Sequence, residues 1–148
     1  MPSITVERHI AAPPDQVFAV ATDFARAPER ITGIRKIEML GDAPVGLGTR
    51  FRETRVMLGR EATEELVVTE FDPPRSYALG CESHGCRYHT ELVFSPQGSG
   101  TDVKMVFEAT PLTLLAKTMS ALLTPMLGKL AEACGKDLDD LKSVIEAR

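Results

Sequence analysis

The chain lacks the features that mark secreted, membrane-spanning and strongly basic proteins. It has only three cysteines in 148 residues, and no apolar run reaches the roughly 18 residues that a membrane-spanning helix needs. Its start, Met1-Pro2-Ser3, has neither the basic nor the apolar segment of a secretion signal. With 17 Lys+Arg against 21 Asp+Glu and a net charge of −4, bulk charge does not favour nucleic acid. We expect a cytoplasmic protein with no disulfide framework, membrane span or nucleic-acid partner.

What the sequence does contain is the composition of a folded domain. Hydrophobic residues make up 43% of the chain and charged residues 26%, a balance typical of globular proteins. A chain of this length falls within the roughly 100–200 residues that one core serves. Because no repeat, low-complexity tract or linker interrupts it, the sequence predicts one domain over residues 1–148.

The first thirty residues predict one strand and two short helices. Ile4–Ile10 alternates apolar and polar side chains, as a half-buried strand does. Pro14 stands where a first helical turn favours proline, ahead of a predicted helix over Asp15–Ala21. A second helical segment is predicted over Asp23–Arg30, before the break at Gly33.

The middle of the chain predicts an antiparallel meander. Short alternating runs are separated by glycine- and proline-rich breaks. His84-Gly85 is typical of a tight hairpin turn, which would pair Glu82 with Arg87. The six predicted strands are Ile34–Leu40, Thr49–Leu58, Arg60–Phe71, Ser76–Ser83, Cys86–Ser95 and Thr101–Ala109.

The last forty residues predict one long helix. Thr110 is the candidate N-cap with Pro111 at the first helical position, and apolar residues then recur every three or four positions as far as Ile145. Pro125 predicts a kink near residues 121–124, because it removes a hydrogen bond and clashes with the preceding turn. A curved sheet wrapped around this helix gives an α+β fold. We expect a cavity of roughly 300–1,000 Å³ where sheet and helix diverge, beside the more apolar first half of the helix.

The element order and several strings resemble the polyketide cyclase/dehydrase-type branch of the START and birch-pollen-allergen superfamily, called SRPBCC. The strings are Ile10-Ala11-Ala12-Pro13 before Val17-Phe18, Thr22-Asp23-Phe24, Gly46-Leu47-Gly48-Thr49, Glu70-Phe71-Asp72-Pro73-Pro74-Arg75 and Gly100-Thr101. The resemblance implies a helix-grip fold in which a seven-stranded sheet and the C-terminal helix enclose a pocket for lipids, polyketides or other apolar molecules. The chain has no tryptophan: Phe18 and Arg30 stand where the family often carries it. No catalytic set of the family can be carried over.

A cluster of cysteines and histidines invites a metal-site hypothesis that the hairpin pattern does not favour. Strand alternation places Cys81 and Cys86 on the face opposite His84 and His89, so four ligands cannot converge on one zinc ion. Cys134, within the helical apolar stripe, is interpreted as a core residue because nothing nearby lowers the pKa of its thiol. The sequence predicts no metal and no other cofactor.

The second meander strand carries two charges on an apolar face. Glu53 and Arg55 alternate in register with Phe51 and Met57, so they point into the cavity if that face does. There they would orient a ligand hydroxyl, carbonyl or carboxylate. The alternative is an ion pair on the rim of the sheet, where charges discourage aggregation.

Two tyrosines, Tyr77 and Tyr88, also fall on apolar strand faces. Their hydroxyls are candidate donors to a ligand, although core tyrosines with a satisfied hydroxyl are equally common. Adding the strand and helix positions expected to face the cavity, the predicted ligand-binding residues are Phe51, Glu53, Arg55, Tyr77, Tyr88, Met105, Phe107, Leu115, Met119 and Leu122.

These observations leave more than one class of function. The interpretation with fewest assumptions is binding or carriage of a hydrophobic small molecule such as a lipid or polyketide. The alternative is a cyclase or dehydratase in the same cavity, with Glu53 as the only inward carboxylate that the pattern offers as a base. A partner-binding module is a third class. The sequence also leaves both a monomer and a homodimer open.

Overall fold

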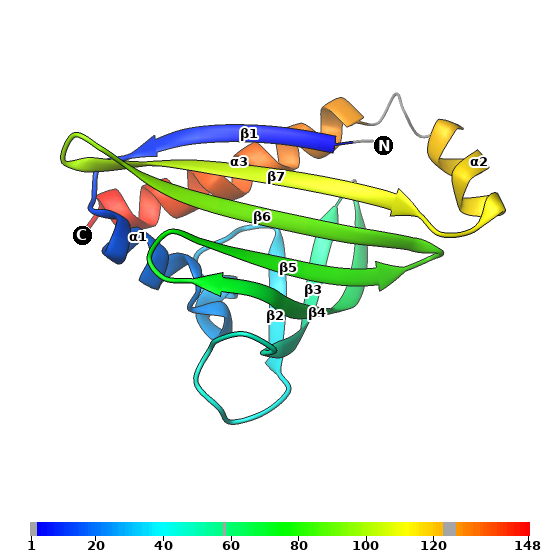
Figure 1. Ribbon diagram of the computed structural model, residues 1–148, viewed down its shortest axis with the longest axis horizontal. Coiled ribbons are helices and arrows are strands. Elements are labelled where there is room, and N and C mark those ends of the chain that lie inside the picture. Colours follow the sequence, from blue (N-terminus) through cyan, green and yellow to red (C-terminus); the bar gives the residue numbers. More distant parts are fainter. Residues whose placement is uncertain (1–2, 58, 123–126) are drawn as a thin grey trace.

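The computed structural model of the protein describes residues 3–57, 59–122 and 127–148; the side chains of Met57 and of residues 119–122 lie outside the description. Figure 1 shows a long curved sheet with helices along its concave side. The elements in chain order are β1 (Ser3–Ile10), α1 (Pro14–Ala21), the 3₁₀ helix η1 (Phe24–Glu29), β2 (Ile34–Met39), β3 (Arg50–Met57), β4 (Arg60–Asp72), β5 (Ser76–Ser83), β6 (Cys86–Gln97), β7 (Gly100–Pro111), α2 (Leu114–Leu122) and α3 (Leu127–Glu146).

The sheet is an antiparallel meander closed by the first strand. Its order is β1-β7-β6-β5-β4-β3-β2, so each strand from β2 to β7 pairs with its neighbour in sequence and β1 returns to pair with β7. Register shifts interrupt the β2–β3 ladder between Ile34 and Lys36 and the β4–β5 ladder between Val68 and Glu70. Irregularities of this kind bend a strand and increase its twist. The curvature leaves space between the sheet and α3, as the helix-grip fold requires.

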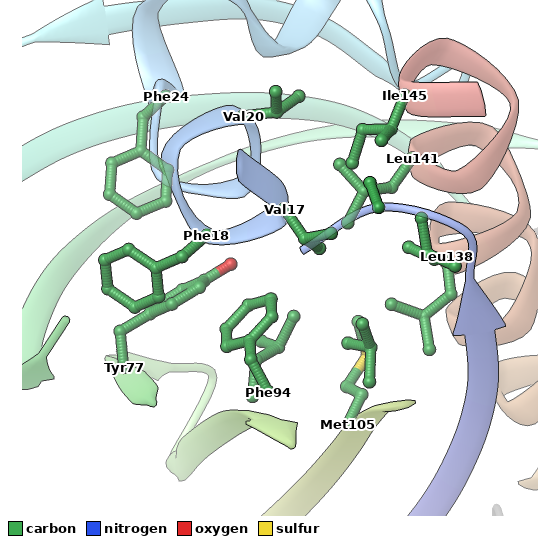
Figure 2. Close-up of a cluster of buried hydrophobic side chains, with 14 of the residues drawn as sticks. Val17, Phe18, Val20, Phe24, Tyr77, Phe94, Met105, Leu138, Leu141 and Ile145 are labelled. Atoms are coloured by element: carbon green, nitrogen blue, oxygen red, sulfur yellow. The ribbon is translucent and has the colours of Figure 1, made fainter. Parts of the chain in front are cut away.

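The helix α3 is the element around which the sheet wraps. Its buried residues Leu138, Leu141 and Ile145 form one stripe, because steps of three and four residues keep side chains on one helical face. This stripe packs on a core that includes Phe18 and Phe94 (Figure 2). The core therefore fills the end of the fold near α1 and the second half of α3.

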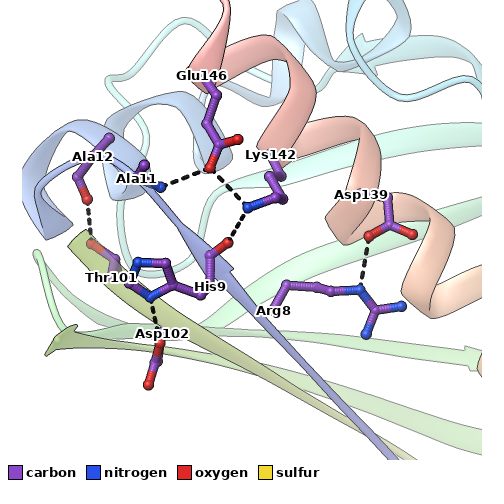
Figure 3. Close-up of polar contacts among 9 residues, drawn as sticks. All are labelled: Arg8, His9, Ala11, Ala12, Thr101, Asp102, Asp139, Lys142 and Glu146. Carbon is purple, nitrogen blue, oxygen red and sulfur yellow. Dashed lines mark hydrogen bonds and ion pairs between the residues drawn. The ribbon is translucent and has the colours of Figure 1, made fainter.

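Polar contacts fix the second half of α3 against β1 (Figure 3). The Lys142 Nζ donates to the His9 carbonyl at 2.6 Å, and a Glu146 carboxylate oxygen accepts the Ala11 backbone N–H at 2.8 Å. One turn earlier, Arg8 Nε lies 2.7 Å from Asp139 Oδ1. Each exposed ion pair contributes little by itself, but together these contacts set the height and rotation of α3 over the sheet.

The local predictions for the sheet and the first helices are confirmed. The predicted strand over Ser76–Ser83 has the same bounds in the structure, and the other strands differ from their predicted bounds by a few residues at either end. The His84-Gly85 turn has φ angles of 53° and 76°, and it pairs Glu82 with Arg87 as expected. The second helical segment is a 3₁₀ helix, in keeping with the proline at position 28.

The predicted start of the long helix is wrong. Thr110 and Pro111 belong to the end of β7, where they pair with Arg87 and Cys86 of β6. Pro111 is tolerated there because the last residue of a strand need not donate to the ladder. The helix begins at Leu114, and the Thr113 side chain caps it by accepting the Ala116 backbone N–H at 3.0 Å.

The single long helix is also replaced by two helices, α2 and α3. The kink predicted at residues 121–124 falls partly on residues 123–126, which lie outside the described residues. Within the part of the chain that the structure describes, no helix is both long enough and apolar enough to cross a membrane.

Candidate functional site

A cavity of about 720 Å³ lies between the concave face of the sheet and the helices. Its volume falls inside the range of roughly 300–1,000 Å³ typical of sites for small molecules. Most of the side chains around it are aliphatic or aromatic, and they come from the sheet, η1, α2 and α3. The cavity therefore lies where the sequence places it, between the sheet and the C-terminal helical segment.

Eight of the ten residues that the sequence singled out contribute to this lining. Phe51, Tyr77 and Met105 are buried, whereas Leu115 on α2 is 74% exposed. Tyr88 and Phe107 stack with their ring centroids 5.8 Å apart. The side chains of Met119 and Leu122 lie outside the described residues. The eight lining residues are Phe51, Glu53, Arg55, Tyr77, Tyr88, Met105, Phe107 and Leu115.

One pole of the cavity carries a charged triad of Glu53, Arg55 and Asp137. Arg55 Nε lies 2.8 Å from Glu53 Oε1, and Arg55 Nη1 lies 2.9 Å from Asp137 Oδ2. Their side chains are between 16% and 21% exposed, so the three charges are largely buried at the wall of the cavity. Glu53 and Arg55 point inward because the alternation of β3 puts them on the face of the buried Phe51.

The electrostatics of the triad reflect burial and mutual attraction. Burial opposes the charge on Arg55, but the adjacent Glu53 and Asp137 carboxylates outweigh it and hold the pKa of the guanidinium above its ordinary value. For Asp137 the balance is reversed: burial raises the pKa of its carboxyl, and the attraction of Arg55 offsets this only in part. The fold therefore raises the proton affinity of the Asp137 carboxyl.

Asp137 is a candidate site residue that the sequence interpretation missed. The sequence pattern offered Glu53 as the only inward carboxylate. Asp137 nevertheless stands three residues after Cys134 and four before Leu141, which is the spacing of that stripe. A carboxylate at a stripe position was the available signal that this side chain faces inward.

Tyr77 stands between the apolar core and the charged pole. Its ring packs edge-on against Phe18 and Phe24, with centroids 6.0 and 5.7 Å away (Figure 2). Burial, with the negative charges of Glu53 and Asp137, raises the pKa of its hydroxyl well above the ordinary value. Among the described residues no side chain or backbone group hydrogen-bonds this hydroxyl, which borders the cavity. It remains a neutral donor at physiological pH.

The β5–β6 hairpin supplies a second, more weakly polar part of the wall. Glu64 accepts a hydrogen bond from Ser83 Oγ at 2.8 Å and lies near Cys81. Burial and the nearby carboxylates raise the pKa of Cys81 to about 11, so its thiol is not an activated nucleophile. Burial and the neighbouring Cys86 raise the pKa of Tyr88 to about 12.

The predicted placement of His84 is wrong. It borders the cavity together with Cys81 and Cys86 instead of lying on the opposite face, because the positive φ of the turn residue breaks the alternation of the strand. All three cysteines are free thiols. Within residues 3–57, 59–122 and 127–148, no group of three or more His, Cys, Asp and Glu side chains is arranged to hold a metal ion.

Sequence comparison places the chain in a family. Residues 1–146 match the family described as polyketide cyclase / dehydrase and lipid transport. The chain belongs to this family. A comparison with curated protein sequences found no match.

Solved structures that are similar to this protein match it over nearly its whole length. The protein TTHA0849 from Thermus thermophilus is 24% identical, with a TM-score of 0.79 over 99% of this chain and 98% of that one. A norcoclaurine synthase from Thalictrum is 18% identical, with a TM-score of 0.74 over 99% and 94%. The di-domain ARO/CYC protein StfQ of steffimycin biosynthesis is 16% identical, with a TM-score of 0.76 over 99% of this chain and 51% of that one. At these identities the likeness establishes the shared fold.

Proposed function

We propose that the protein binds a hydrophobic small molecule, such as a lipid or polyketide, in the cavity between the sheet and the C-terminal helices. The observation that carries this proposal is a cavity of about 720 Å³ whose walls are mostly apolar and whose charges gather in a few places. An apolar body would replace water against these walls, which is favourable in proportion to the apolar area removed from water. The family description, which includes lipid transport, supports the same interpretation.

The proposed binding residues are the lining residues named from sequence, with Asp137 added. Phe51, Met105 and Phe107 would contact the apolar body. The triad of Glu53, Arg55 and Asp137, together with the Tyr77 hydroxyl, would fix the polar end, because charge-assisted hydrogen bonds are directional. Leu115, largely exposed on α2, would contact the ligand near the entrance to the cavity.

The test is binding to the wild-type protein and to a variant with a filled cavity. A ligand that binds only the folded state stabilises it by about 2.7 kcal/mol at a hundred times its Kd. A panel of fatty acids, fatty alcohols and polyphenols should therefore include members that raise the Tm. Extraction and mass spectrometry of the freshly purified protein would identify any ligand that copurifies.

Ala109→Phe is the informative variant, because Ala109 borders the cavity and is the cross-strand neighbour of Tyr88 in the β6–β7 ladder. It should abolish the Tm shift by occupying the space. Ala147→Phe, the same change at an exposed position, should keep the shift. Equal shifts in both variants, or none in the wild type, would refute binding in this cavity.

A second candidate function is supported by the placement of two carboxyl groups, Glu53 and Asp137, at the wall of the cavity, where burial raises the pKa of Asp137. Carboxyl groups with shifted pKa values in clefts are typical of general acids and bases. The protein would then be a cyclase or dehydratase in which Glu53 or Asp137 moves a proton of the bound substrate. Incubation with a linear poly-β-ketone probe, followed by mass spectrometry for a dehydrated or cyclised product, tests this.

The variant Glu53→Gln separates the two functions. A binder should lose the roughly 1.5–3 kcal/mol of a charge-assisted hydrogen bond for ligands with a polar head and nothing for purely apolar ligands. An enzyme with Glu53 as base should lose about a hundredfold or more in turnover with little change in binding.

A further inference from the structure

The charged groups around the cavity do not balance. Its lining includes the acidic residues Asp23, Glu53, Glu64 and Asp137, two arginines, and the exposed imidazole of His84 at the hairpin turn. Asp23 is paired with one of the arginines, since its carboxylate lies 3.4 Å from Arg30 Nη1. The other, Arg55, pairs with Glu53 and Asp137, and Glu64 has no cationic partner among the described residues. The lining therefore carries an excess of negative charge within an apolar enclosure, where charges interact more strongly than in water.

The strand register concentrates this excess. Glu53 of β3 is directly opposite Glu64 of β4 in the antiparallel ladder, and both border the cavity. Like charges directly opposite each other on neighbouring strands destabilise a sheet. Asp137 brings a further carboxylate to the same pole from α3, 2.9 Å from Arg55. Because the fold brings these carboxylates together, a bound cation would reduce the repulsion between them.

The hydrogen-bond donors and acceptors at this pole also favour a bound cation. Arg55 already donates from Nε to Glu53 and from Nη1 to Asp137. Each carboxylate offers about four lone-pair positions, so the described residues supply donors to only a minority of the acceptor positions at this pole. Tyr77 adds a hydroxyl on a side chain that is only 5% exposed and that has no hydrogen-bond partner among the described residues. Burial raises the pKa of this hydroxyl, and the charges of Glu53 and Asp137 raise it further, so the hydroxyl lies within reach of both carboxylates.

From these contacts we infer that the ligand of the cavity carries a protonated amine at its polar end, held by Glu53 and Asp137 with the Tyr77 hydroxyl alongside and the negative charge of Glu64 nearby. This inference rests on the proposed function, because it names the head group of the molecule that the cavity binds. An ammonium group supplies three N–H donors and one positive charge to the free carboxylate positions. A carboxylate head would compete with Glu53 and Asp137 for Arg55 and would be repelled by both.

The experiment compares three probes of the same chain length, decylamine, decanol and decanoate, at neutral pH and below their micelle concentrations. The amine is protonated there, as a lysine side chain is. Each probe displaces Nile red, a neutral apolar dye, from the wild-type protein. We expect decylamine to bind most tightly, decanol less tightly, and decanoate at least roughly tenfold more weakly than decylamine, a ratio that corresponds to about 1.4 kcal/mol.

Variants at the pole test the cause of the order. Asp137→Asn should lower the affinity for decylamine several-fold and leave decanol nearly unchanged. Glu64→Gln should likewise lower the affinity for decylamine and leave decanol nearly unchanged. Because this variant keeps Glu53 and Asp137, both partners of Arg55, it provides the test if the Asp137 variant does not fold. Asp139→Asn is the matched control, because Asp139 pairs with Arg8 at the surface and should leave the preference intact.

The outcomes distinguish failure of the cationic head group from failure of ligand binding in the cavity. If the dye and decanol bind but decanoate binds as tightly as decylamine, the cationic head group is refuted and ligand binding stands. If the order holds in the wild type but survives both pole variants, the pole is not its cause and the inference fails. If no probe binds and the dye is not taken up, the proposed function fails with it.

Discussion

Arg55 on β3 and Asp137 on α3 are 82 residues apart in the chain, yet Arg55 Nη1 lies 2.9 Å from Asp137 Oδ2. β3 lies on the side of the sheet away from β1. This contact therefore connects that side of the sheet to α3, the helix that the sheet encloses. The same guanidinium also binds Glu53, two residues before it on β3. Arg55 is thus both a tie between sheet and helix and the counter-charge for the carboxylates of the cavity.

Removing Arg55 should destabilise the fold severely. Arg55→Ala leaves Glu53 and Asp137 largely buried and without their counter-charge, and breaking a buried ion pair in this way costs about 3–5 kcal/mol. Urea unfolding followed by circular dichroism measures the loss. The control is Arg52→Ala on the outer face, where an exposed pair with Glu38 predicts a loss of at most about 1 kcal/mol. Equal losses in the two variants would contradict the role given to Arg55.

The raised pKa of Asp137 predicts a specific pH dependence of stability. The ordinary value is 3.8, and the folded protein binds this proton more tightly than the unfolded chain does. The resulting stabilisation is complete below the ordinary pKa and is lost as pH rises through the raised pKa. In urea unfolding at a series of acidic to neutral pH values, Asp137→Asn should therefore gain stability relative to the wild type as pH rises.

The same substitution at the exposed Asp139 controls for loss of one negative charge on α3. If Asp137→Asn loses stability relative to the wild type with rising pH, Asp137 ionises more readily in the folded state than in the unfolded one. That result would contradict the burial argument.

Cys81 should react slowly with alkylating reagents. With a pKa of about 11 against an ordinary 9.0, its thiolate fraction at neutral pH falls by about two orders of magnitude, and the thiolate is the reactive form. Iodoacetamide labelling of the native protein, read by peptide mass spectrometry, should be roughly a hundredfold slower at Cys81 than for free cysteine. Labelling at the rate of the free amino acid would show that the thiol is neither buried nor surrounded by carboxylates.

Elemental analysis of the purified protein tests the prediction that Cys81 and Cys86 hold no metal. The expected result is no zinc or iron in proportion to protein. Stoichiometric metal would overturn this prediction and would require the hairpin to be rearranged, since strand geometry keeps His89 away from the two thiols.

Thr113 should be the residue that stabilises the start of α2. Its Oγ1 accepts the Ala116 N–H, and loss of such a cap costs about 1 kcal/mol. Hydrogen exchange of the α2 amides should therefore speed up about fivefold in Thr113→Ala, which is that free energy expressed as a ratio. Thr110→Ala, in β7, should leave the exchange rates of the α2 amides unchanged. Faster exchange in Thr110→Ala but not in Thr113→Ala would instead support Thr110, the N-cap predicted from sequence.

Short-range chemistry explains what the sequence by itself determined. The meander and the His84-Gly85 turn depend on alternation and turn geometry within a few residues, so the chain alone predicted them. Alternation also placed Glu53 and Arg55 on one face with Phe51. The helix start was mispredicted because Thr110-Pro111 satisfies the local rules for a helix start, while pairing with Arg87 and Cys86 across the sheet outweighs them.

Only the tertiary structure decided which charges meet. Asp137 joins Arg55 because the polar contacts of α3 with β1 and its buried Leu138 stripe fix how the helix rotates over a curved sheet. That rotation depends on the packing of segments more than a hundred residues apart, and no local pattern encodes it. The sequence by itself therefore determined that Glu53 and Arg55 share a strand face with Phe51, and the fold brought Asp137 to that pair at the wall of the cavity.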